Sequence, residues 1–223
     1  SWTSGPSGIG FNSGGGSNVA YGNLPGAGGS FGFPGPWGHD FVVHSNINIT
    51  QLGVFDSGAD GLKRTLTAEL WSRDGDTGVE LAELTFTPSD PGALVDSNRF
   101  KPLATPLKLE PGDYTIVAHG FGSNEKVGHE GLAGPSSDFK TLNDGDGVIS
   151  FVGTSRLGTS PGTFPSIVES GPANYFSAGT FEFNTIGTEV QVSTDIAAAM
   201  HNINASVYLR MEFEAVAPAA DPD

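Results

Sequence analysis

The stretch between Ile47 and Trp71 constrains the fold more than any other part of the chain. Its side chains alternate between apolar and polar along two runs, a period that is typical of β-strands with one buried face. An acidic, glycine-rich sequence, 56–61, separates the runs and is rich in turn-forming residues, so we predict a hairpin. The expected faces of the first strand are Ile47, Ile49, Gln51, Gly53 and Phe55 against Asn48, Thr50, Leu52 and Val54; in the second, Leu66, Ala68 and Leu70 alternate with Thr65, Thr67, Glu69 and Trp71.

Short runs of the same kind recur along the chain, separated by turn residues. The 33 glycines and 15 prolines leave little room for long helices, and only 195–200 is helix-like. A length of 223 residues is ordinary for one sandwich. The pattern predicts an all-β fold, an antiparallel β-sandwich of jelly-roll type. Its expected core consists of Leu52, Val54, Phe55, Leu66, Leu70, Leu84, Phe86, Ile116, Phe151 and Phe181.

Composition divides the chain into three parts: an N-terminal arm over 1–37, a sandwich domain over 38–187 and a C-terminal extension over 188–223. The arm is rich in Gly, Ser and Pro yet carries six large aromatic rings, which a flexible linker would not need. We expect the rings to dock either on their own domain or on a neighbouring subunit. The extension contains a run of alternating residues, 206–215, that predicts a long strand with one apolar face.

The charge of the chain argues against several classes of partner. Ten basic residues against 25 acidic ones give a net charge of −15, which would repel nucleic acid and makes cations the natural counter-partners. The absence of cysteine excludes disulfides, thiolate catalysis and cysteine-bound zinc. No run approaches the ~20 apolar residues of a transmembrane segment, so we predict none. A start at Ser1 favours a processed protein, secreted or at the cell surface, or a shortened expression product.

Four pieces of the chain carry a family resemblance: DFVVHSNINITQLGVFDSGADGL, LTAELWSRDGDTGVELAELTF, NRFKPLATPLKLEPGDYTIVAHG and NYFSAGTFEFN. In this order they resemble exported bacterial β-sandwich proteins, many of which end in a Pro-Glu-Pro sorting signal. The resemblance spans residues 39–183 and implies the sandwich fold and a place on the cell surface or in the extracellular matrix. It implies no activity. The C-terminus, 216–223, lacks the Pro-Glu-Pro triplet, and the arm and the extension lie outside the resembling part.

Acidic turns are the candidate metal sites. Ca²⁺ takes six to eight oxygen ligands, which Asp residues and exposed carbonyls in glycine-rich loops can supply. The alternative is a turn without an ion. The candidate ligands for a Ca²⁺ ion are Asn143, Asp144 and Asp146, or Asp56 and Asp60, and the turn that holds Asp74 and Asp76 has the same character.

The sequence contains no strong candidate for a catalytic site. The chain has no nucleophile elbow, phosphate-binding loop or dinucleotide fingerprint, and His129-Glu130 is not followed by the second histidine of a zinc-protease helix. His44 and His119 lie at predicted strand ends and could meet in space, but a hydrogen-bonded structural role is favoured for them. We therefore expect no enzymatic activity. Rings that could stack on sugars are Trp71, Tyr114 and Tyr175, although aromatic residues of small domains also fill cores.

These features favour a non-catalytic extracellular structural protein that forms a homopolymer as a surface, matrix or fibre subunit. The alternative is a carbohydrate-binding adhesion module with glycan partners. In the homopolymer, the arm or strand 206–215 would add to an open sheet edge of the next subunit. The residues expected to make this contact are Trp2, Phe11, Tyr21, Phe31, Phe33 and Trp37 in the arm and Val207, Leu209, Met211 and Phe213 in the extension.

Overall fold

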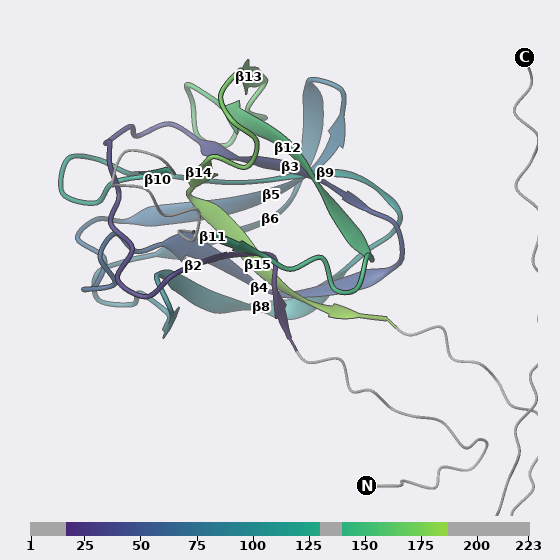
Figure 1. Cartoon of the computed structure of the whole chain (residues 1–223), viewed down its shortest axis with the longest axis horizontal. Coiled ribbons are helices and arrows are strands. Elements are labelled where there is room, and N and C mark those ends of the chain that lie inside the picture. Colours follow the sequence, from purple (N-terminus) through teal and green to yellow (C-terminus); the bar gives the residue numbers. More distant parts are fainter. Residues whose placement is uncertain (1–16, 130–139, 187–223) are drawn as a thin grey trace, which may run out of the picture. The chain divides into compact units, whose positions relative to one another are not determined.

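Two antiparallel sheets pack face to face in the computed structural model, which describes residues 17–129 and 140–186 (Figure 1). No helix occurs in these residues, so the predicted all-β sandwich is confirmed. The helix expected at 195–200 and the strand expected at 206–215 lie outside them. The five-stranded sheet has the order β1 (Asn18–Val19), β15 (Gly179–Thr185), β4 (Ile47–Phe55), β8 (Asn98–Leu109) and β7 (Ala93–Val95). The six-stranded sheet has the order β13 (Ile167–Glu169), β12 (Ile149–Leu157), β3 (Trp37–Val43), β9 (Gly112–His119), β5 (Leu66–Asp74) and β6 (Thr77–Phe86).

Two small two-stranded pairs complete the description: β2 (Tyr21–Asn23) with β11 (Lys140–Leu142), and β10 (Gly128–His129) with β14 (Phe176–Ser177). The chain changes sheet at most of its connections. From β3 it crosses to β4, returns to β5, and crosses again from β6 to β7 and from β8 to β9. Long-range pairing therefore holds both sheets together.

The predicted hairpin between Ile47 and Trp71 is wrong. Both strands exist, but β4 belongs to the five-stranded sheet and β5 to the six-stranded one. Strand β5 instead forms a hairpin with β6, through the turn at Asp74 to Thr77. The connection between β4 and β5 is longer than the two to five residues of ordinary hairpin loops, and it bridges the two sheets at one end of the sandwich.

The predicted faces of β4 are also wrong, because a β-bulge interrupts the strand. Ile49 pairs with Phe183 of β15 and Gln51 with Glu182, so Thr50 is an additional residue on β4. The extra residue shifts the alternation by one position. Ile47 and Ile49 before the bulge, and Leu52 and Val54 after it, are all fully buried in the core, although the sequence pattern placed the two pairs on opposite faces.

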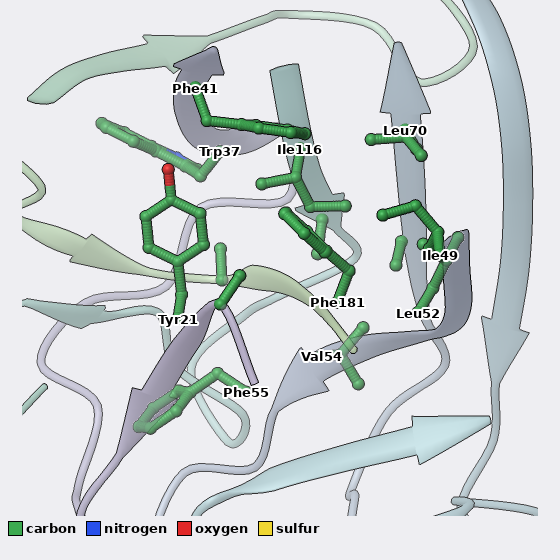
Figure 2. Packing of buried hydrophobic residues seen from close by; sticks show 14 of the residues in the cluster. Tyr21, Trp37, Phe41, Ile49, Leu52, Val54, Phe55, Leu70, Ile116 and Phe181 are labelled. Atoms are coloured by element: carbon green, nitrogen blue, oxygen red, sulfur yellow. The ribbon is translucent and has the colours of Figure 1, made fainter. Parts of the chain in front are cut away.

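The core fills the space between the sheets. All but two of the predicted core residues are buried, and the exceptions, Leu84 and Phe151, are partly buried against the same cluster. Figure 2 shows side chains of both sheets meeting there, among them Phe41, Leu70, Ile116, Ile49, Leu52 and Phe181. Phe41 and Phe181 lie with ring centroids 4.7 Å apart and bring the two sheets into contact.

Residues 17–37, which the composition assigned to an arm, belong to this sandwich. Strand β1 pairs with β15, and β2 pairs with β11. The chain then runs over the end of the sandwich, where the backbone of Ser30 and Phe31 bonds to that of Val127. A Cβ atom on Gly32 would clash with the backbone of Gly122. Glycine at this position therefore permits close backbone approach rather than flexibility.

Candidate functional site

The outer face of the six-stranded sheet carries the densest set of buried ionisable groups among the described residues. On β5, Thr67, Glu69 and Trp71 point away from the main core, yet all three are buried. The loop 158–166 covers Glu69 and Trp71. Its Gly162 N–H donates to Oε1 of Glu69 at 3.0 Å, and the Phe164 ring packs edge-on against Trp71 with centroids 5.9 Å apart. Sequence alternation placed this face in solvent.

Glu69 is held as a carboxylate although it is fully buried. Burial alone would raise its pKa, but bonds from His119, the Gly162 N–H and Trp71 outweigh that effect and lower the pKa. Nε2 of His119 lies 3.0 Å from Oε1, and Nε1 of Trp71 donates to Oε2 at 3.2 Å. Glu69 therefore ties β9 and the covering loop to β5.

Asp40 and Arg156 form a second ionic group on the same face, between β3 and β12. Nε of Arg156 lies 3.0 and 2.9 Å from the two Asp40 oxygens, and Thr115 donates to Oδ1 at 2.6 Å. The same guanidinium donates to Asp76 at 2.8 Å and to the Gly75 carbonyl at 3.1 Å. Asp40 is 2 % exposed and Arg156 is 4 % exposed. The pair therefore anchors the β5–β6 turn to the sheet and offers no free oxygen to a substrate.

A third polar group lies within the core, around His39. Burial, and next the charge of Lys140, lower the pKa of His39 well below its ordinary value, so the ring is neutral. Its Nδ1 is 3.3 Å from the Ser155 hydroxyl, and its Nε2 is 3.2 Å from Nζ of Lys140. The Tyr21 ring stacks on it with centroids 5.2 Å apart. Ser155 is buried, so this Ser–His contact supports the core and is closed to substrate.

The predicted metal site at Asp56 and Asp60 is a turn held together by carboxylates. Oδ2 of Asp56 accepts bonds from Arg99 at 2.7 Å and from the Gly61 N–H at 3.2 Å, while the exposed Asp60 pairs with Lys63. The buried Glu125 accepts the N–H groups of Ser57 and Lys63, both at 2.9 Å. Oδ1 of Asp56 has no partner in the described part of the chain. Backbone N–H groups that point into the turn suit carboxylates and disfavour a cation.

The other acidic turns are open to solvent. Asn143, Asp144 and Asp146 are exposed, and Oδ1 of Asn143 accepts the Gly145 N–H at 2.9 Å, which is ordinary turn geometry. The Asp76 carboxylate forms an ion pair with the Arg156 guanidinium. In residues 17–129 and 140–186, no three His, Asp or Glu side chains gather as metal ligands. Hydrogen bonds account for the Asn143 and Asp76 side chains, and a Ca²⁺ site at these turns stays a prediction.

Four of the predicted assembly rings pack on their own domain. Tyr21 and Trp37 are buried, and Phe31 and Phe33 are partly buried, each with its ring against Trp37. This is the first of the two arrangements expected for the arm. The other predicted assembly residues, Trp2, Phe11, Val207, Leu209, Met211 and Phe213, lie outside the described residues.

The rings proposed for sugar binding do not form a platform. Trp71 lies beneath Phe164, Tyr114 stacks on Phe41 and donates to the Glu110 carbonyl at 2.9 Å, and Tyr175 packs edge-on against Phe176. His44 and His119, which could have met at the strand ends, do not. Strands β3 and β9 are antiparallel, with Val43 opposite Gly112, so the two histidines lie at opposite ends of the pair.

The free edge of β6 is the surface that sequence reasoning did not single out. Strand β6 has 10 residues and pairs only with β5; its other edge has no strand partner within the described ranges. Val79 is 67 % exposed and Leu81 is 36 % exposed. Between them Glu80 faces Glu69 and Glu83; burial and these two carboxylates raise its pKa. The sequence pattern did not reveal this edge, because glutamates alternate with its apolar residues, as they do in an ordinary strand with one face in solvent.

The chain matches no protein-family model, and a search among curated proteins finds no similar sequence. Across the described residues, no helix has the length and apolar character needed to span a membrane.

Proposed function

We propose that the protein is a non-catalytic, extracellular structural subunit that associates with further copies of itself. The observation that carries this proposal is the free edge of β6. A row of unpaired backbone groups with exposed apolar side chains is a template for another strand. Val79 and Leu81 provide such side chains on a strand of 10 residues.

The burial of the polar groups that could act in catalysis supports the non-catalytic part of the proposal. Glu69, Asp40 and Ser155 are each at most 2 % exposed, and each bonds to a structural partner. The extracellular part rests on the turn-rich composition and on the resemblance to exported sandwich proteins.

The test is sedimentation velocity of the full chain over a wide range of concentrations, with negative-stain microscopy of the largest species. Leu81→Lys places a charge on the edge and should raise the concentration needed for association about tenfold or more, since burying an unpaired charge opposes docking. Val152→Lys is the matched control, because Val152 is 48 % exposed but lies on β12, which three strands separate from β6 in the same sheet. A full chain that stays monomeric throughout would contradict the proposal.

A further inference from the structure

The loop 158–166, which connects β12 to β13, is held on the outer face of the sheet by an aromatic contact and a hydrogen bond. The aromatic contact is made by Phe164, whose ring centroid lies 5.9 Å from that of Trp71 and 5.4 Å from the guanidinium carbon of Arg156. A Cβ atom on Gly78 of β6 would clash with the Phe164 ring, so glycine at this position leaves the space that the ring fills. The shape of the outer face therefore fits the closed loop.

The hydrogen bond joins the tip of the loop to β5. The Gly162 N–H donates to Oε1 of the buried Glu69 at 3.0 Å, while residues 159–163 are themselves exposed to solvent. A short exposed segment that buries little apolar area opens locally at low cost. The position of the tip therefore depends on its bond to Glu69.

The acceptor of this bond is the group that acid changes. The charged and titratable side chains that face Glu69 are His119 on β9 and Glu80 and Glu83 on β6, and the loop itself contains none. Protonation removes the negative charge of Glu69, and a hydrogen bond to a charged acceptor is roughly twice as strong as one to a neutral acceptor. Arg156 keeps its charge in acid, so its contact with the Phe164 ring does not change directly.

We propose that the loop 158–166 is an acid-released cover: protonation of Glu69 frees Gly162, the loop leaves β5, and Trp71 becomes accessible to solvent. Trp71 pairs with Glu80, so the uncovered ring adjoins the edge strand β6. Burial raises the pKa of Glu69, but the bonds that it accepts outweigh burial and keep the pKa below 4.5. The loop is therefore closed above this value and is released as the pH falls through the folded pKa. The inference goes beyond the proposed self-association, which does not require the loop to move.

Amide hydrogen exchange of the full chain, followed by NMR and corrected for the intrinsic effect of pH, tests the release. Between about pH 6 and pH 3, which bracket the ordinary pKa of a glutamate, the protection of the Gly162 amide should fall about tenfold. The amide of Ala68, a core residue on the same strand β5, should keep its protection, because the sandwich stays folded. In a chain labelled with 5-fluorotryptophan, the Trp71 fluorine signal should become sensitive to the exchange of H₂O for D₂O over the same range.

Two variants separate the hydrogen bond from the aromatic contact. Glu69→Gln keeps an oxygen acceptor for Gly162 but does not titrate, so the protection of Gly162 should not depend on pH. Phe164→Ala removes the aromatic contact at an exposed loop and should lower the protection of Gly162 at both pH values while its dependence on pH remains. The inference is overturned by a wild type in which Gly162 is equally protected at both pH values, by an equal fall in Glu69→Gln, or by a fall that occurs only together with that of Ala68.

Discussion

Strand β5 is buried on both faces, and the two faces are stabilised in different ways. The inner face presents Leu66, Ala68 and Leu70 to the apolar core. The outer face presents Glu69 and Trp71 to the loop 158–166, and Glu69 also to an ionic partner on the neighbouring strand β9. The inner face gains stability from apolar area removed from water, which depends on volume and shape. The outer face depends on charges that must stay paired.

The largest effect is expected on the outer face, from Arg156→Met. The substitution keeps most of the apolar stem but leaves Asp40 buried, with Nε of Arg73 at 3.5 Å as its nearest remaining charge. Breaking a buried ion pair by removing one partner costs about 3–5 kcal/mol. The free energy of unfolding by urea measures this loss. Lys108→Met removes an exposed pair with Glu110 and should cost under about 1 kcal/mol. Equal losses in the two variants would show that the outer-face pair is not a buried one.

Removing both charges at once sharpens the contrast between the faces. In Asp40→Asn with Arg156→Met, neither charge of the pair remains, so the double variant should recover about 1–3 kcal/mol relative to Arg156→Met alone. A double variant that is less stable than Arg156→Met alone would contradict the ionic account of the outer face.

On the inner face, Leu70→Ala should cost about 2–5 kcal/mol, because it leaves a cavity in a closely packed core. Leu70 is fully buried, whereas Leu81, one strand away, is 36 % exposed, so Leu81→Ala is the matched control with a smaller loss. Thermal or urea unfolding of the two variants gives the comparison. A loss below that of Leu81→Ala would place Leu70 on the wrong face of β5.

The third effect is a pH dependence that only the outer face should show. The pKa of Glu69 is lowered from its ordinary value of 4.5, so the unfolded chain binds a proton at pH values where the folded protein does not. The stability from Glu69 is therefore present above that value and is lost as the pH falls through the folded pKa. Glu69→Gln should cost about 1–3 kcal/mol at neutral pH and flatten the decline of stability with acidification. Glu83→Gln, on the exposed residue opposite Glu69, is the control. Parallel stability curves for the wild type and Glu69→Gln would refute this role.

The smallest effect separates two glutamates that share one face. Burial and the nearby carboxylates raise the pKa of Glu80, whereas hydrogen bonds outweigh burial and lower that of Glu69. Carboxyl carbon NMR during a pH titration should show Glu80 titrating above 4.5 and Glu69 below it. Glu80→Gln should change stability by no more than about 0.5 kcal/mol. The reverse order of titration would mean that loop 158–166 does not cover Glu69 in solution.

The sequence predicted the fold class and most strands of the sandwich, because period-two alternation reports directly on one-sided burial. It could not predict pairing. The β4–β5 hairpin was wrong because alternation does not say which sheet a strand joins. The bulge at Thr50 is equally invisible, since inserting one residue leaves both halves of β4 alternating.

The candidate site was less predictable than the fold. Glu69 has the pattern of a solvated residue, and only its neighbour Trp71, an aromatic residue on the supposed solvent face, signals that something covers it. The ion pair of Asp40 and Arg156 joins residues 116 positions apart, which no local pattern reveals. In residues 17–37, abundant glycine suggested an arm, although glycine there permits close backbone contact. Composition does not distinguish these two uses of glycine.

The pairing of the first and last described strands governs the order in which the fold can be completed. Ser17 bonds to Glu182, 165 residues further along the chain, and β4 lies between β8 and β15 in its sheet. At about 5–20 residues per second on the ribosome, β4 waits on the order of ten seconds before β15 has been synthesised. Throughout that interval one edge of β4, with its row of aliphatic side chains, has no partner. Synthesis therefore creates a window for misassembly between nascent chains, in which β4 is a binding site for a chaperone that recognises extended apolar segments.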